Sequence, residues 1–371
     1  MDRSFSSTFC HVVCAVMLVT FLILPGYSRG EEAAITLDGL IDEALKNNPE
    51  ILAATERWLA TEATISQVST LPNPQLTFGI RNVGFDELTV GEESMSMVGI
   101  TAAQMIPFPG KLSLRGKIMG METERQKELL NATRLNVLSR LKVAYYSLFF
   151  VHKSIEVIEK DKEILEKFEQ IAEAKYAVGE GIQQDVLKAQ VEISRFVERL
   201  TDLEQKRESL EAEINSLLDR PPHAPLGQPA EVKQSVFRYS LEELNKLAEA
   251  NSPRLLAVQW AIDRNSSALS LAKREYFPDF TVKAGWFNRP EGFKNIWDFN
   301  VGVEVPLYFG RKERYGVKEA EFSLNSARQS YEATRQTLLF KVKDYYVIAQ
   351  TADKLVKLYG TGIVPQASLS L

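Results

Sequence analysis

In this sequence of 371 residues, metal binding or catalysis would be indicated by the histidines and by known catalytic motifs. The three histidines are His11, His152 and His223, and their positions do not match the spacing of metal ligands. The sequence contains no nucleophile elbow, phosphate-binding loop or Rossmann fingerprint. We therefore predict a protein with no catalytic residue, no bound metal and no cofactor, whose function depends on the elements that the chain builds.

The N-terminal residues read as an export signal. Arg3 precedes an apolar run over residues 12–24, which is too short to span a bilayer. We predict that residues 1–30 are a cleaved signal peptide, with a retained N-terminal anchor as the alternative. Cleavage would remove both cysteines, Cys10 and Cys14, and leave a thiol-free protein in an oxidising compartment.

The charge balance excludes one large class of partners. Forty-four Lys and Arg residues stand against 49 Asp and Glu residues, for a formal net charge of −5. A chain without a basic excess or a basic cluster interleaved with aromatics is a poor ligand for a phosphate backbone. We predict that nucleic acid is not a partner, and that an exported acidic protein of this kind belongs to a bacterial envelope.

The second half of the sequence repeats the first. At an offset of 204 residues, Thr36-Leu37, Asn47, Pro49 and Pro74 align with Ser240-Leu241, Asn251, Pro253 and Pro278. At an offset of 200 residues, Gly110-Lys111 and Tyr145-Tyr146 align with Gly310-Arg311 and Tyr345-Tyr346. We predict two copies of one unit, residues 36–220 and 238–371, joined by a proline-rich linker over 221–237.

Each copy begins with helices and continues into alternating segments. Asn48-Pro49 and Ser252-Pro253 place a capping residue before a proline at the first helical position, which predicts a helix start in both copies. Period-2 alternation then predicts two β-hairpins, at about 74–105 and about 278–306. In the last strand Phe299, Val301, Val303 and Val305 alternate with the polar residues Asp298, Asn300 and Glu304, which predicts one apolar and one wet face.

After each hairpin the pattern becomes helical over a long distance. We predict a helix over 111–178, a return helix over 183–218 and, in the second copy, a long helix over 311–358. The return helix carries heptad positions at Val186, Ala189, Ile193, Phe196, Leu200, Leu203, Arg207, Leu210, Ile214 and Leu217. This repeat predicts coiled-coil packing against the outgoing helix, rather than a solitary amphipathic helix on a globule.

The strands have the length of membrane-spanning β-structure. Segments of about ten residues can cross a bilayer when tilted, but four strands cannot close and open edges are not viable in lipid. If the strands span a membrane, several chains must therefore pool them into one barrel. Phe85, Trp286 and Trp297, near strand ends, suit an interfacial aromatic girdle, with Phe287, Phe293, Phe108, Tyr308 and Phe309 as further members. The alternative is a soluble hairpin pair with core aromatics.

Several short motifs stand out at the junctions of the predicted elements. They are residues 44–51 (ALKNNPEI), Gly110-Lys111 and Gly310-Arg311, and residues 174–179 (AKYAVG) followed by 184–190 (QDVLKAQ). Together these motifs resemble those of the TolC-type outer membrane efflux proteins. Residues 104–111 (QMIPFPGK) are similar to the heavy-metal, Czc/Cus-type, branch.

The resemblance implies a mainly α protomer with membrane β-structure, three copies of which form a homotrimer with a 12-stranded barrel in outer membrane lipid. A long α-helical barrel would continue the duct across the periplasm. It further implies a non-enzymatic exit duct that docks a periplasmic adaptor (membrane fusion protein) and an inner membrane pump, with export of drugs or metal cations.

The resemblance also implies a role for the turn between the two long helices. It places adaptor contact and the closing gate at Tyr176, Gly179, Gly181 and Asp185. The two glycines would supply the backbone freedom to reverse direction, and Asp185 can instead simply cap the return helix.

An acidic cluster lies in the first hairpin loop and comprises Asp86, Glu87, Glu92 and Glu93. We predict that it is solvated, with attraction of cations at a pore mouth as the alternative.

The sequence departs from the family in its second copy. Only 25 residues follow Tyr346, so we expect the second tip and return helix to be missing. The chain is then either truncated or a shortened member of the family, and its ending at what reads as the beginning of a helix favours truncation. The predicted function is the outer membrane channel of a tripartite, RND-type efflux system, located in the outer membrane and extending into the periplasm. The alternatives are a periplasmic coiled-coil adaptor and the outer membrane duct of a type I secretion system.

Overall fold

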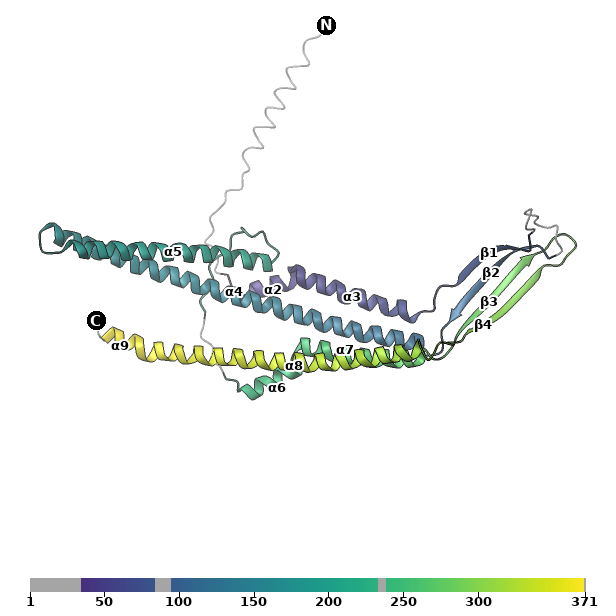
Figure 1. Ribbon diagram of the computed structural model, residues 1–371. Helices are drawn as coiled ribbons and strands as arrows, with labels where there is room; N and C mark the ends of the chain where they lie inside the picture. The colour runs from purple at the N-terminus through teal and green to yellow at the C-terminus, as the bar shows by residue number, and fades with distance from the viewer. Residues whose placement is uncertain (1–34, 84–94, 233–237, 370–371) are drawn as a thin grey trace, which may run out of the picture. The chain divides into compact units, whose positions relative to one another are not determined.

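The computed structural model describes residues 35–83, 95–232 and 238–369 (Figure 1). The chain divides into two compact units. Unit 1 contains Ala144–Ser216 and Arg220–Val232 together with the N-terminal segment up to Leu40, and unit 2 contains Ile41–Val143, Leu217–Asp219 and the chain from Lys233 onward. The predicted signal peptide and Phe85 with its acidic cluster lie outside the described residues.

Two successive helices begin each copy of the repeat. In the first copy α2 (Leu37–Asn47) leads into α3 (Pro49–Ser69), and in the second α6 (Leu241–Asn251) leads into α7 (Pro253–Arg274). Asn48 and Ser252 are the N-caps of α3 and α7, as their position before proline predicts. The Asn48 side chain accepts hydrogen bonds from two backbone amides of the first turn, and Ser240 forms a capping box on α6.

The two predicted hairpins form a single antiparallel sheet in unit 2. Its strands are β1 (Gln75–Arg81), β2 (Met97–Ile106), β3 (Asp279–Asn288) and β4 (Ile296–Glu304), in the order β1-β2-β3-β4. The β2–β3 pairing joins the first copy of the repeat to the second, with Ala102 opposite Ala284. Sequence periodicity predicts the two hairpins separately, because it carries no information on pairing between segments so distant in the chain.

The sheet is apolar on one face. Large exposed side chains of the edge strands lie on this face: Leu76, Phe78 and Ile80 of β1, and Phe299, Val301 and Val303 of β4. The opposite face contains Phe287, which is only 3% exposed and lies across Gly99 and Gly285 beneath the guanidinium of Arg81. The prediction that Phe287 belongs to an outward aromatic girdle is therefore wrong, because strand alternation turns it to the other face.

Two helices of unit 1 form an antiparallel hairpin. Helix α4 (Lys111–Ala177) enters this unit at Ala144, and α5 (Gln183–Leu217) returns after a short turn (Figure 1). All ten predicted heptad positions of α5 are buried or half-buried, and Ile214 is fully buried. The heptad prediction is confirmed.

Helix α4 has a matching seam that the sequence analysis did not identify. Its buried and half-buried positions follow steps of four and three residues: Ala144, Leu148, Val151, Ile155, Ile158, Lys162, Leu165, Glu169 and Ala172. Lys162 and Glu169 interrupt the apolar pattern, which hides the seam from a hydrophobicity count. Both helices of the hairpin therefore have the spacing of coiled-coil packing.

The described part of the proline-rich segment is anchored to unit 1. Asn215, which is fully buried, donates hydrogen bonds to the carbonyls of Pro222 and Ala224. Ile35 pairs with Pro229 in an isolated parallel bridge, and the Tyr145 hydroxyl donates to the Ile35 carbonyl at 3.1 Å. The segment breaks the helix as its prolines require but is held by polar contacts.

The second copy ends in a long helix of unit 2. Helix α8 (Glu313–Leu358) packs against α6 and α7, and is followed by a π-helical turn, η1 (Tyr359–Ile363), and by α9 (Val364–Leu369). Among the described residues, no helix combines the length and apolar character needed to cross a membrane.

Candidate functional site

The turn between α4 and α5 is the predicted tip. Gly179 adopts a φ of +78°, and the Glu180 amide donates to the Lys175 carbonyl at 2.9 Å, which closes the turn. Gly181 does not adopt a positive φ. A glycine is needed there for space instead, because a Cβ would lie 3.0 Å from the Tyr176 nitrogen. The prediction that both glycines supply backbone freedom therefore holds for Gly179 only.

The other tip residues lie on the surface of the turn. Tyr176 is 49% exposed and lies in the last turn of α4. Asp185 lies inside the first turn of α5, which begins at Gln183. It is therefore not at the capping position, which was the alternative role expected for this residue. A carboxylate there interacts favourably with the helix dipole. Exposed Val178 and Ile182 flank the turn, so the tip presents both apolar and polar groups.

The predicted wet face of β4 is polar. Asp298, Asn300 and Glu304 lie opposite Gly285, Lys283 and Asp279 of β3. Asn300 donates to the Asp298 carboxylate at 2.7 Å. The predicted interfacial residues Trp286 and Trp297 are directly opposite each other on the other face, 38% and 67% exposed, so one end of the sheet has a paired indole surface.

A buried lysine joins the two copies where the sheet meets the helices. Lys111, the first residue of α4, is 2% exposed, and its Nζ lies 2.9 Å from both a Glu275 and an Asp279 carboxylate oxygen. It also donates to the Phe277 carbonyl at 3.0 Å, and Asp279 accepts from the Phe108 amide at 2.7 Å. We call Lys111, Glu275 and Asp279 the junction triad.

Electrostatics and packing both support the junction triad. Burial lowers the pKa of Lys111, but its hydrogen bonds and charge interactions with Glu275 and Asp279 outweigh burial and raise that pKa above the usual value. Phe108 stacks on Phe277 with ring centroids 4.6 Å apart. Sequence reasoning placed Phe108 in a membrane girdle and used Lys111 only as a motif residue. The sequence feature that could have indicated this site is the pair of carboxylates, Glu275 and Asp279, on either side of Pro278.

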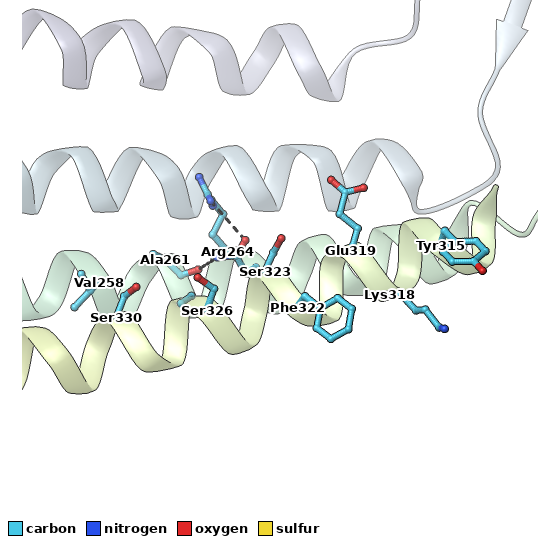
Figure 2. Close-up of a pocket in the computed structure, with 12 residues that line it drawn as sticks. Val258, Ala261, Arg264, Tyr315, Lys318, Glu319, Phe322, Ser323, Ser326 and Ser330 are labelled. Atoms are coloured by element: carbon cyan, nitrogen blue, oxygen red, sulfur yellow. Dashed lines mark hydrogen bonds between the residues drawn. The ribbon is translucent and has the colours of Figure 1, made fainter. Parts of the chain in front are cut away.

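A shallow groove runs between α7 and α8 in unit 2 (Figure 2). Its floor is made of small side chains, Ala261, Ser323, Ser326, Ala327 and Ser330, and exposed Tyr315 and Phe322 lie at its edge. Arg264 has its Nη1 2.9 Å from a Glu122 oxygen on α4. The small side chains of the floor suit close packing between α7 and α8. The Arg264–Glu122 ion pair joins α7 of the second copy to α4 of the first.

A polar pair interrupts the helical hairpin of unit 1. His152 on α4 is half-buried, and its Nε2 has no hydrogen-bond partner among the described residues. Burial and then the charge of Arg207 on α5 lower the pKa of His152 below its usual value. Arg207 lies at a heptad position and is 3.8 Å from Glu211. A polar residue at such a position specifies helix register and lowers stability.

His152→Leu is expected to raise the free energy of unfolding by about 1 kcal/mol, because it removes an unsatisfied buried polar group. The wild-type hairpin should lose stability as the pH falls below 6.5, since the unfolded histidine binds a proton that the folded one resists. The variant should lose this part of the pH dependence. Denaturant unfolding followed by circular dichroism at two pH values measures both effects.

His223→Leu is the matched control, since His223 is exposed in the proline-rich segment. It should leave the free energy of unfolding at neutral pH unchanged within about 0.5 kcal/mol. An equal acid sensitivity in the His152→Leu and wild-type proteins would contradict the assignment.

The chain thus combines a four-stranded sheet that is apolar on one face with long helices, two of which have coiled-coil spacing. A family model described as outer membrane efflux protein matches residues 40–219 and 244–363. The chain belongs to the outer membrane efflux protein family. It is an outer membrane protein that extends into the periplasm, as the resemblance implies, and members of this family are passive channels and not enzymes.

Similar proteins span most of the chain. The cobalt-zinc-cadmium resistance protein CzcC of Cupriavidus metallidurans is 23% identical over 323 residues, which cover 85% of this chain and 73% of CzcC. The outer membrane protein TolC of Vibrio cholerae is 25% identical over 333 residues, covering 84% of this chain and 74% of TolC.

Solved structures show the same protomer fold. CusC has a TM-score of 0.75 at 16% identity, over 92% of this chain and 83% of CusC. VceC of Vibrio cholerae has a TM-score of 0.75 at 17% identity, over 90% of this chain and 83% of VceC. The predicted fold class, mainly α with membrane β-structure, is confirmed.

Proposed function

We propose that this chain is the exit duct of a tripartite efflux system and works as a homotrimer. Three copies of the four-stranded sheet would make a twelve-stranded barrel in outer membrane lipid. The long helices would continue the duct through the periplasm, where the tip residues Tyr176, Gly179, Gly181 and Asp185 contact a periplasmic adaptor that in turn meets an inner membrane pump. Asp298, Asn300 and Glu304 would face the lumen.

One observation carries this proposal: α4 has a second heptad stripe that is exposed. Val143, Phe150, Val157, Ile164 and Ile171 recur every seven residues, and each is more than half exposed. A stripe of this spacing is suited to packing against a further helix. Since the seam with α5 uses other positions of α4, the stripe supports lateral association of several copies into a helical wall.

The cargo proposed for this duct is a divalent heavy-metal cation. CzcC is named for resistance to cobalt, zinc and cadmium, and the polar face of β4 carries the carboxylates Asp298 and Glu304. Among the described residues no group of three or more His, Cys, Asp or Glu has metal-site geometry. Conduction requires that an ion binds well enough to enter the duct but weakly enough to leave it. A wall lined by carboxylates without a closed metal site would meet this requirement.

The tip role is tested by Gly179→Pro, which cannot keep the φ of +78°. In a cell that depends on this duct for metal resistance, we expect about tenfold weaker adaptor binding, equivalent to about 1.4 kcal/mol, and a matching loss of resistance. Trimers extracted from the outer membrane fraction should stay intact. Binding is measured with purified adaptor, and resistance by growth in cobalt, zinc or cadmium.

Gly292→Pro is the matched control. Gly292 also has a positive φ, of +92°, but lies in the loop between β3 and β4. Its replacement should leave adaptor binding unchanged. Unaltered adaptor binding in Gly179→Pro would refute the tip assignment, and recovery of the wild-type protein in the soluble periplasm without detergent would refute the duct itself.

A further inference from the structure

A pocket of about 250 Å³ lies at the end of β4, beside the junction triad. We propose that this pocket binds a primary alkylammonium ion, whose N–H groups donate to the carboxylates of Glu313 and Glu304. The inference goes beyond the proposed duct function. It does not depend on the homotrimer either, because residues of unit 2 of a single chain line the whole pocket.

Glu313, the first residue of α8, places a buried and unsatisfied carboxylate oxygen in this pocket. Its side chain is only 6% exposed, and its Oε2 atom has no hydrogen-bond partner among the described residues. Lys312 lies 4.0 Å from the other oxygen, Oε1, through an Nζ atom on a side chain that is 81% exposed. A buried acceptor without a donor is costly, so the pocket favours a ligand that carries N–H groups and positive charge.

The junction triad shows how the same region satisfies a buried charge with its own residues. Lys111 also lines the pocket, and its Nζ lies 2.9 Å from both Glu275 and Asp279, so these two carboxylates already have a cation. Glu304 lies opposite Asp279 on the sheet and has no ion pair within the described part of the chain. Glu304 and Glu313 are therefore the acceptors that remain for a ligand.

The other walls of the pocket favour an organic cation over a metal ion. Phe277 is 48% and Tyr308 77% exposed, and both line the pocket together with Val305 and Leu307. Aliphatic side chains pack against methylene groups, and aromatic faces attract cations. A metal ion instead needs several oxygen, nitrogen or sulfur ligands, and the described residues contain no group of three or more His, Cys, Asp or Glu that could hold one.

Size and hydrogen bonding narrow the ligand further. Pockets for drug-sized ligands occupy about 300–1,000 Å³, so this smaller one suits a chain of a few carbon atoms. The Oε2 atom of Glu313 needs an N–H donor, which an ammonium group provides and a quaternary amine lacks. The ligand is thus a primary ammonium group on a short carbon chain. Free alkylamines and the ethanolamine headgroup of a phospholipid both supply this chemistry.

Saturation-transfer NMR with ethylammonium tests the site in the full-length protein in detergent. A ligand of this size reaches a Kd on the order of 1 mM at best. Glu313→Gln should weaken binding about tenfold, because the amide keeps the shape of the side chain but loses the charge. Lys312→Met should strengthen binding about threefold, since it removes an exposed cation that competes for Glu313.

Glu332→Gln is the matched control, because Glu332 is exposed on α8 and does not line the pocket. It should leave the Kd of ethylammonium unchanged. Ethanol, tetramethylammonium and Zn²⁺ are the competitors, and none should displace ethylammonium at equal concentration. Displacement by Zn²⁺ would assign a metal site instead, and equal binding to the wild-type and Glu313→Gln proteins would overturn the proposal.

Nanodiscs of two lipids separate the two sources of the ammonium group. If a headgroup fills the pocket, ethylammonium binding should be lost in phosphatidylethanolamine but kept in phosphatidylcholine, whose amine is quaternary. Equal binding in both lipids that Glu313→Gln still weakens would assign the pocket to a free amine. Absence of saturable binding in detergent and in both lipids, for the wild-type and Lys312→Met proteins alike, would overturn the site and leave the duct function untouched.

Discussion

Lys111→Met is expected to lower the free energy of unfolding of the sheet and its adjoining helices by about 3–5 kcal/mol, the usual cost of leaving buried charge unpaired. Lys111 is 2% exposed and pairs with both Glu275 and Asp279. Its removal leaves the Asp279 carboxylate without its cation, while Glu275 keeps only Arg115, whose Nη2 lies 3.6 Å from a Glu275 oxygen. Because the pKa of Lys111 is raised, the wild-type contribution is fully present below pH 10.5 and is lost only as the pH rises through that higher folded pKa.

Two comparisons sharpen the junction prediction. Arg311→Met changes the repeat counterpart of Lys111, which is exposed, and should alter stability by only about 0.5 kcal/mol. Replacing the whole triad, Lys111→Met with Glu275→Met and Asp279→Leu, should recover most of the loss, because an apolar set needs no charge compensation. Thermal unfolding followed by circular dichroism compares all three. Equal destabilisation by Lys111→Met and Arg311→Met would show that the triad is not structural.

Leu148→Ala is expected to cost about 2–5 kcal/mol, the range for truncating a buried leucine. Leu148 is fully buried at a heptad position of α4, so the variant leaves a cavity in the seam of the helical hairpin. Faster hydrogen exchange should appear in α4 beyond Ala144 and along α5, with little change in the sheet. Exchange monitored by mass spectrometry on the full-length protein measures this directly.

Phe150→Ala is the matched control, two residues further along the same helix. Phe150 is 68% exposed on the outer stripe, so its loss should not accelerate exchange within the hairpin. It should instead weaken association between copies, which is read as earlier dissociation of trimers on heating in detergent. If Phe150→Ala loosened the hairpin as strongly as Leu148→Ala, the division between a folding seam and an assembly stripe would be wrong.

Local patterns predicted the elements of this chain well. A capping residue before proline started α3 and α7 where expected, because Asn48 and Ser252 bond the amides of their own first turns. The heptad of α5 predicted positions that are buried or half-buried in the structure. Helix α4 was recognised, but its seam was not, since Lys162 and Glu169 occupy two of the seam positions.

The candidate site was predicted in part. The tip was recognised from its glycines, but a sequence shows neither which glycine needs a positive φ nor that Asp185 lies inside the helix. Phe287 was misplaced because its neighbours in the chain do not reveal that Gly99, on a distant strand, leaves room for its ring.

By itself the sequence determined the duplication, the order of helices and strands, the heptad seam of α5 and the family. Each of these depends on patterns among residues close together in the chain, or on the similarity between its two halves. Only the tertiary structure decided that the two hairpins form one sheet and that Lys111 is buried between Glu275 and Asp279. Those features depend on contacts between residues more than 150 positions apart, whose pairing no local periodicity specifies.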